Sequence, residues 1–166
     1  MEIHTMSSFL RYYERIRYRT NQVINVVPPE QLDWTYKAGK FTLADLIRHI
    51  AAIERDLYAE TLLGRPSRYR GCGKELADGY EGVLQYFHSM HNESVAIFQS
   101  IGDEGLERKC RLPTGGEISA WKWLLALTEH EIHHRGQLYL YLGMLGVSTP
   151  PIFGLSAEQL QKVSRT

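Results

Sequence analysis

The chain contains 166 residues, of which 43% are hydrophobic, and its 19 basic side chains balance its 19 acidic ones. This length suits a single domain spanning residues 1–166 with a sizeable core, and the hydrophobic content excludes a wholly disordered protein. The zero formal charge argues against a nucleic-acid-binding protein, because contacts with phosphates require an excess of cations. Two cysteines, Cys72 and Cys110, are too few for a disulfide scaffold or a cysteine-rich zinc site.

Targeting and membrane signals are weak. The N-terminal residues carry no basic-then-apolar signal for secretion, so we expect a cytoplasmic protein. Residues 136–157 lack any formal charge and are long enough to cross a bilayer, but Pro150-Pro151 would break a helix there. We therefore expect no membrane span, and interpret this stretch as the end of one helix followed by a surface turn.

Helical periodicity marks the first part of the chain. Apolar residues recur every three or four positions over residues 6–27, and Pro28-Pro29 stops this first helix. The second helix is predicted to begin at Thr42, a good N-cap residue, with Asp45 three residues later. Its apolar face continues as far as Gly64, where we expect the helix to end.

Two further helices are predicted over residues 79–101 and 119–145. Strand patterns are poor, and only residues 109–112 and 117–119, which flank Pro-Thr-Gly-Gly, could form a short hairpin. Four amphipathic helices without a sheet to pack against predict an all-α four-helix bundle, with moderately long connections and one short β-hairpin before the last helix.

The connection from residue 64 to residue 78 is basic and rich in glycine. A loop of this kind is most often solvated surface, and binding of an anionic ligand is the alternative. Its cations are Arg65, Arg68, Arg70 and Lys74.

The last helix carries two histidines on its apolar face. On a helical wheel, His130 and His134 fall in the stripe formed by Ala120, Trp123, Leu127, Leu138, Tyr141 and Leu145. His133 points away from this stripe, so we expect it to be exposed. Buried imidazoles need partners, and the spacing of i and i+4 places both rings on one side, which suits a shared ion of the zinc or nickel type. Carboxylates, carbonyls or waters could satisfy them instead.

A third ligand would have to come from another helix, and the wheel leaves two candidates. His49 lies at the boundary of the apolar face of the second helix, four residues after Asp45, which could orient its second ring nitrogen. His91 lies in line with apolar residues of the third helix and competes equally well. His4 and His88 have no such neighbours and are expected at the surface.

Residues 130–134 also match the H-E-x-x-H pattern, in which two histidines bind zinc and the glutamate serves as general base of a metalloprotease. Glu131 falls near the edge of the inward stripe, so geometry alone does not exclude that role. The surrounding sequence argues against it, because a metzincin would need glycine at Gln137 and histidine at Leu140. The chain also lacks strands for a substrate-binding sheet.

Two segments together resemble the DinB-like superfamily. They are residues 41–55, Phe-Thr-Leu-Ala-Asp-Leu-Ile-Arg-His-Ile-Ala-Ala-Ile-Glu-Arg, and residues 130–137, His-Glu-Ile-His-His-Arg-Gly-Gln. Residues 29–34 and 142–147 are similar to the same family, so the resemblance covers most of the chain. It implies a four-helix bundle in which His49, His130 and His134 hold one divalent transition-metal ion. On family grounds, this choice favours His49 over His91.

The resemblance also implies a homodimer, because members of the family commonly pair through helix faces. It implies a small-molecule substrate as well, because the family includes transferases and isomerases that use bacillithiol, mycothiol or glutathione. We therefore expect a metal-dependent enzyme that transfers a low-molecular-weight thiol to an electrophile. The alternatives are a non-catalytic, dimeric, stress-associated metal-binding module and a metal-assisted hydrolase of a small substrate. Arg135, beside the ligands, could bind an anion or brace the neighbouring helix. Neither Cys72 nor Cys110 has the sequence context of a nucleophile.

Overall fold

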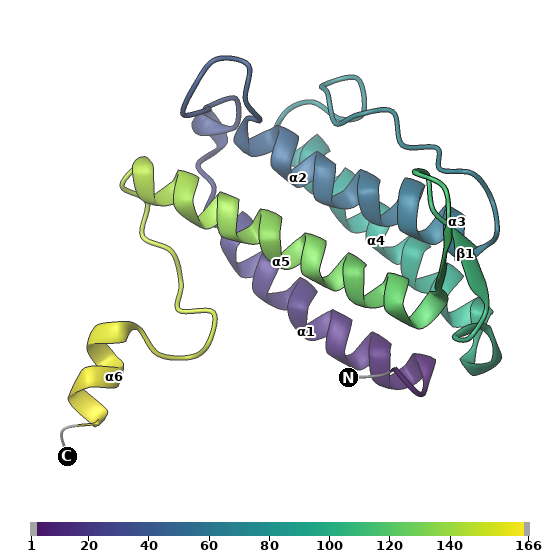
Figure 1. Ribbon diagram of the computed structural model, residues 1–166. Helices are drawn as coiled ribbons and strands as arrows, with labels where there is room; N and C mark the ends of the chain where they lie inside the picture. The colour runs from purple at the N-terminus through teal and green to yellow at the C-terminus, as the bar shows by residue number, and fades with distance from the viewer. Residues whose placement is uncertain (1–2, 165–166) are drawn as a thin grey trace.

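The computed structural model describes residues 3–164, and the prediction of an all-α four-helix bundle is confirmed (Figure 1). The second helix begins as a regular α-helix and continues through a π-helical segment into a last α-helical turn. The long helices of the bundle are α1 (Met6–Ile24), α2 (Leu43–Ala52) with its continuations η2 (Ile53–Ala59) and α3 (Glu60–Leu62), α4 (Tyr80–Ile101) and α5 (Ala120–Met144).

A short hairpin joins α4 to α5, as the sequence predicts. Its strands β1 (Lys109–Arg111) and β2 (Glu117–Ser119) pair in antiparallel fashion. Short 3-10 turns, η1 (Pro29–Gln31) and η3 (Asp103–Gly105), lie in the connections after α1 and α4.

Side-chain capping fixes where the second helix begins. The backbone amide of Asp45 donates to Thr42 Oγ1 at 3.0 Å, and the amide of Thr42 donates to Asp45 Oδ2 at 2.9 Å. This reciprocal pair satisfies two amides that have no partner within the helix. The predicted start at Thr42 is therefore confirmed.

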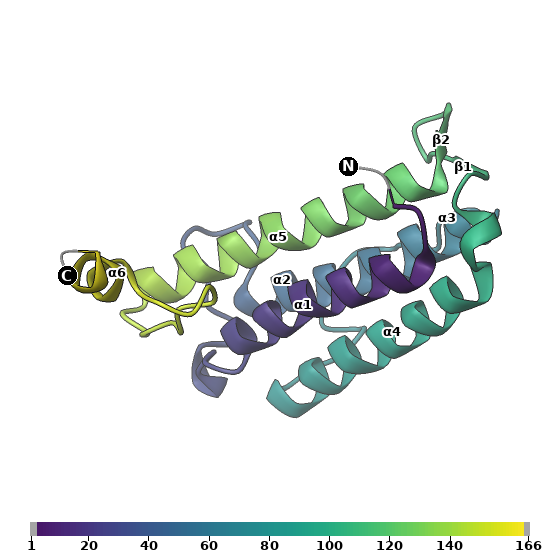
Figure 2. The same cartoon turned by 90° about the horizontal axis from the view of Figure 1, so that it is seen from below.

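The helices run in an order that requires one long connection. Phe9 of α1 shares an apolar cluster with Leu124 of α5, and Val23, further along α1, shares another with Leu138, further along α5. These two helices therefore run in the same direction, and α2 and α4 also share a direction (Figures 1 and 2). Because α2 and α4 are parallel, the chain must return along the length of α2 before α4 begins. Residues 63–79 make this return.

The interior consists of two apolar clusters, one towards each end of the bundle. One cluster gathers Leu43, Leu46, Ile47, Val83 and Phe87 with the last turns of α1 and α5. The other gathers Phe9, Tyr13, Phe98, Leu124 and Leu127 near the hairpin. Several polar side chains are also buried, His91 and His134 among them, whereas His49 and His130 are only partly buried.

The expected end of the last long helix and the turn after it are present, because α5 ends at Met144 and residues 145–156 are irregular. A further helix that the sequence analysis did not predict, α6 (Ala157–Val163), follows this turn. Ser156 and Gln159 form a capping box at its start, with the Gln159 amide donating to Ser156 Oγ and the Ser156 amide donating to Gln159 Oε1. This helix lies beyond the end of the bundle (Figure 2). Within residues 3–164, no helix combines the length and the apolar character needed to cross a membrane.

Candidate metal centre

Three histidines from two helices meet where α2 and α5 pack against each other. His49 comes from α2, whereas His130 and His134 come from successive turns of α5. One nitrogen of each ring lies within 4.8 Å of a nitrogen of the other two, and His49 Nε2 is 3.2 Å from His130 Nε2. The structure thus brings together the three residues selected from the sequence, although 81 positions separate His49 from His130.

Burial keeps these three imidazoles neutral. It lowers the pKa of His49 to about 4 and that of His130 to about 3, with a further contribution from the neighbouring rings. The pKa of His134 is also lowered, chiefly by burial. Each ring therefore has a free lone pair at neutral pH, which is the form that binds a metal ion.

The second nitrogens of the three rings have different surroundings. His134 Nδ1 donates to Gln137 Oε1 at 2.7 Å, and His49 Nδ1 lies 2.8 Å from the hydroxyl oxygen of Tyr69. The Nδ1 atom of His130 is buried and has no hydrogen-bond partner in the described part of the chain. An unpaired polar atom in the interior costs free energy.

Asp45 does not orient His49, contrary to our expectation. One of its carboxylate oxygens caps the start of α2 at Thr42, and the other accepts from Arg48 Nη2 at 2.6 Å. Both oxygens are therefore engaged elsewhere, and a loop residue, Tyr69, takes the place that we expected Asp45 to fill.

The donor set fits a divalent transition-metal ion. Zinc binds imidazole nitrogen at about 2.0–2.1 Å, so two nitrogens on one zinc ion lie at most about 4.2 Å apart. The 3.2 Å separation between His49 and His130 satisfies this limit, and all three ligand nitrogens lie within 4.8 Å of one another. Among residues 3–164, no aspartate, glutamate or cysteine belongs to the same group of potential ligands. Three neutral nitrogen donors suit zinc or nickel better than magnesium or calcium, which prefer oxygen ligands.

A cavity of about 680 Å³ is lined by two residues that contact the histidines, although none of the three histidines lines it. Phe41, on its wall, packs against His49 with ring centroids 5.2 Å apart, and Gln137, also on its wall, holds His134. Most of the remaining lining is aromatic or aliphatic, and Lys40 is its one charged member. The cavity is lined by Tyr36, Gly39, Lys40, Phe41, Gln137, Leu140, Tyr141 and Met144.

The π-helical segment brings a tyrosine close to His130. Tyr58 lies with its ring centroid 6.2 Å from that of His130 and 4.3 Å from that of Trp123. Burial, aided by the charge of Glu129, raises the pKa of Tyr58 to about 12, so the phenol stays protonated. Sequence periodicity does not reveal this segment, because one wide turn shifts the phase of the helix without changing its composition.

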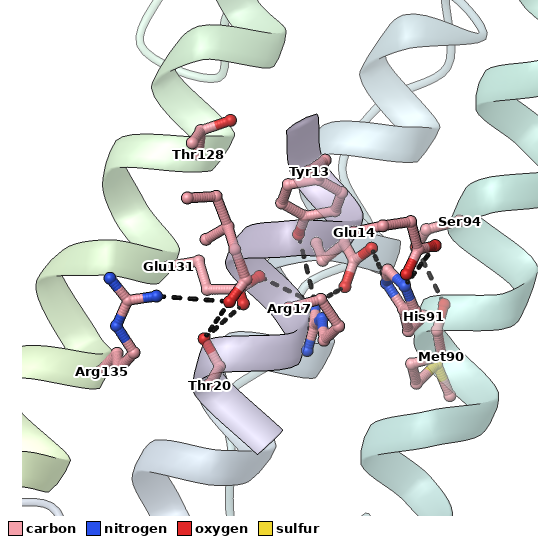
Figure 3. A network of polar contacts seen from close by, with 12 residues as sticks. Tyr13, Glu14, Arg17, Thr20, Met90, His91, Ser94, Thr128, Glu131 and Arg135 are labelled. Carbon is pink, nitrogen blue, oxygen red and sulfur yellow. Dashed lines mark hydrogen bonds and ion pairs between the residues drawn. The ribbon is translucent and has the colours of Figure 1, made fainter. Parts of the chain in front are cut away.

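Glu131 belongs to a different polar network, which faces α1 (Figure 3). Its carboxylate accepts from Thr20 Oγ1 at 2.6 Å and pairs with Arg17 Nη2 at 3.1 Å. Glu131 is fully buried and is not a member of the histidine group. The metalloprotease interpretation of the H-E-x-x-H pattern therefore fails, because the glutamate faces another helix instead of the proposed metal.

Arg17 is the centre of this network. It also pairs with Glu54 of η2, whose other oxygen lies 2.8 Å from His91 Nδ1. Burial alone would lower the pKa of Arg17, but the Glu131 and Glu54 carboxylates raise it above its ordinary value. The helical wheels do not predict that Arg17 and Glu54 are buried. A charged residue is normally exposed, and its burial becomes predictable only when its partners on other helices are known.

His91 faces the interior, as its wheel position indicates, but away from the candidate metal centre. Its Nδ1 lies beside Glu54, and its Nε2 lies 3.2 Å from Glu14 Oε1. His4, His88 and His133 are exposed, as expected.

Arg135 braces α1. It is 5% exposed, and its Nη1 donates to the backbone carbonyl of Ile16 at 3.3 Å. Of the two roles open from the sequence, the contact with the neighbouring helix is the one present in the structure (Figure 3).

The basic connection is solvated, and three of its cations pair with acidic residues of the protein. Arg68 contacts Asp56 and Glu60, Arg65 lies 3.9 Å from Glu60, and Lys74 pairs with Asp33 at 2.6 Å. These pairs leave no dense cluster of free cations for an anion.

Comparisons with known proteins agree with this architecture. The sequence profile of the DinB superfamily matches residues 12–138, a range that contains all three histidines. YjoA of Bacillus subtilis (strain 168) is 24% identical over 138 residues, covering 81% of this chain and 86% of YjoA.

Two solved structures share the fold. YfiT from Bacillus subtilis, described as a probable metal-dependent hydrolase with an unusual four-helix bundle topology, superposes with a TM-score of 0.68 at 19% identity, covering 86% of this chain and 89% of YfiT. A mycothiol-dependent maleylpyruvate isomerase gives a TM-score of 0.60 at 12% identity, over 82% of this chain and 63% of the isomerase. Because the family profile spans most of the sequence, this chain belongs to the DinB superfamily.

Proposed function

We propose that this protein is a metal-dependent enzyme in which His49, His130 and His134 hold one zinc or nickel ion. The observation that carries the proposal is the convergence of three neutral imidazoles from two helices, with His49 and His130 nitrogens 3.2 Å apart. Neutral ligands require no proton release before they coordinate. Three protein ligands, as opposed to four, are typical of catalytic sites, which keep a position for a small molecule.

The reaction that we propose is transfer of a low-molecular-weight thiol to an electrophilic small molecule. When bound, the ion would lower the pKa of a coordinated thiol or water and so supply a nucleophile at neutral pH. Within the part of the chain that the structure describes, no carboxylate belongs to the histidine group. This favours a thiol, because a thiol needs less help from a general base than water does. The fold is shared with an isomerase that is mycothiol-dependent by name, which supports the use of a low-molecular-weight thiol.

The cavity beside the histidines supports a small substrate. Its aromatic and aliphatic walls suit an apolar body, and Lys40 suits an anionic group such as a carboxylate. Phe41 and Gln137 contact the candidate ligands and also line the cavity, so a molecule bound there would lie one side chain away from those ligands.

Hydrolysis is the second candidate, because YfiT, which shares the fold, is described as a probable metal-dependent hydrolase. A non-catalytic, stress-associated module with a structural ion is the third. We also propose a homodimer without nucleic-acid or membrane partners, working in the cytoplasm, where reduced thiols are maintained. Light scattering of the purified protein tests the assembly.

The activity is tested by loading the protein with zinc or nickel and adding thiols with a chromogenic electrophile. The panel contains bacillithiol, mycothiol and glutathione. We expect turnover with at least one thiol, its loss in His134→Ala and its retention in the adjacent, exposed His133→Ala. Equal rates in wild type and His134→Ala contradict the proposal. Turnover of ester or amide substrates without any thiol favours the hydrolase.

A further inference from the structure

Residues 63–79, which connect α3 to α4, are held against α2 beside His49. Arg48, which is 1% exposed, donates from Nε to the Cys72 carbonyl at 2.7 Å and from Nη1 to the Ala77 carbonyl at 3.0 Å. Its remaining terminal nitrogen pairs with Asp45 at 2.6 Å. One buried guanidinium group thus holds two points of the connection against the helix, and Asp45 holds the guanidinium in place.

This fastening presents the Tyr69 side chain to His49. The Tyr69 hydroxyl oxygen lies 2.8 Å from His49 Nδ1, and the two rings meet edge to face with centroids 5.6 Å apart. The amide of Tyr69 donates to Ser67 Oγ at 3.2 Å, which shapes the backbone just before it. The His49 ring is therefore held from one side by a residue 20 positions later in the chain.

The contact determines which His49 nitrogen faces the candidate metal. Nδ1 and Nε2 lie on different edges of the imidazole ring, and Nε2 is the atom that faces His130 at 3.2 Å. If Nε2 gives its lone pair to an ion, Nδ1 must carry the proton of the neutral ring. Nδ1 then donates to the Tyr69 oxygen, and the Tyr69 O–H remains free to donate to the Cys72 thiol, with which it also interacts.

We infer that Tyr69 is a positioning residue for the metal centre, which fixes the ring orientation and the tautomer of His49. The inference rests on the proposed role of His49 as a ligand. His134 receives similar help from Gln137 within its own helix, whereas the support of His49 comes from a separate connection. Partners of this kind around a metal site typically change its affinity by 10- to 100-fold.

The test is Tyr69→Phe, which keeps the ring and removes the hydroxyl group. We expect zinc affinity, measured by competition with a chromogenic chelator, to fall by at least 10-fold. The midpoint of thermal unfolding of the metal-free protein should stay close to that of wild type, which separates positioning from a general loss of structure. Tyr18→Phe removes an exposed tyrosine hydroxyl group and should bind zinc as wild type does.

Nitrogen NMR of zinc-loaded wild type decides the same question without a variant. We expect His49 Nδ1 to carry a proton and Nε2 to be the metal-bound atom, and the opposite tautomer overturns the inference. Unchanged zinc affinity in Tyr69→Phe also overturns it. His49→Ala separates the two proposals, because wild-type zinc affinity in that variant refutes the ligand set itself. Weakened binding in His49→Ala with normal binding in Tyr69→Phe refutes only the positioning role.

Discussion

Arg17 lies 3.1 Å from Glu131 across the interface between α1 and α5, and both side chains are withdrawn from solvent. Glu131 follows His130 directly in the sequence, yet the two side chains belong to different networks. Successive residues of a helix point about 100° apart, so α5 can contribute to the candidate metal centre on one side and to an ion-pair network on the other.

The Arg17 network predicts a large loss of stability when its cation is removed. Arg17→Met leaves the buried carboxylates of Glu54 and Glu131 without their shared counter-ion. We expect the free energy of unfolding to fall by about 3–5 kcal/mol, measured by urea denaturation. Arg15→Met, at an exposed position of α1, serves as the control and should change stability by less than about 0.5 kcal/mol. A loss no larger than that of the control would contradict a structural role for the network.

Metal binding should stabilise the fold through the three histidines. At a free zinc concentration 100 times the dissociation constant, the free energy of unfolding should rise by about 2.7 kcal/mol. His49→Ala, His130→Ala and His134→Ala should lose stoichiometric metal in elemental analysis, whereas His133→Ala should retain it. Equal loss in His133→Ala would mean that the ligands are wrongly assigned.

The lowered pKa values predict how the metal-free protein responds to acid. Histidines of the unfolded chain take up protons near their ordinary pKa of 6.5, whereas folded His49 and His130 stay neutral down to about pH 4 and 3. The unfolded state therefore binds more protons in this range, and the free energy of unfolding must fall as the pH drops from about 6.5 towards 4. Urea denaturation at pH 7, 6 and 5 in the presence of a chelator measures this. His130→Ala should show a shallower decline, and an identical decline would refute the assignment to this histidine.

The fastened connection predicts slow reaction of Cys72 with thiol reagents. Burial, together with the nearby Asp45 charge, raises the pKa of the Cys72 thiol. In a Cys110→Ala background, we expect Arg48→Met to increase the rate at which Cys72 reacts with a disulfide reagent. A factor of roughly tenfold or more is expected, since each lost hydrogen bond to a charged group is worth about 1.5–3 kcal/mol. An unchanged rate would show that Arg48 does not hold the connection closed.

The features that the sequence predicts correctly depend on local signals. Thr42 and Asp45 mark a helix start through contacts three residues apart. Pro28-Pro29 shows that the first helix must stop before them, although α1 ends earlier than predicted, at Ile24. The helix α6 could have been found in the same way, because Ser156 and Gln159 have the spacing of a capping box. The hairpin was predicted from its Pro-Thr-Gly-Gly turn and the short strand segments on either side, and the structure contains it.

Local sequence signals predict only part of the candidate site. His130 and His134 share a face because of the helical repeat, which one segment reveals by itself. The choice of His49 over His91 depends on how α2 packs against α5, and that packing is a property of the whole fold. The sequence gives no indication that Tyr69 contacts His49, because Tyr69 lies in an irregular connection and its partner lies on a helix.

The common direction of α2 and α4 has a consequence for how this protein tolerates insertions and deletions. Surface loops usually accept changes in length at little cost, but residues 63–79 reach His49 only because they trace the helix back. Shortening this segment would move the Tyr69 hydroxyl away from the His49 ring, and lengthening it would leave the position of Tyr69 poorly defined. Natural variation in loop length should therefore be scarce here and more frequent at the turn of the hairpin.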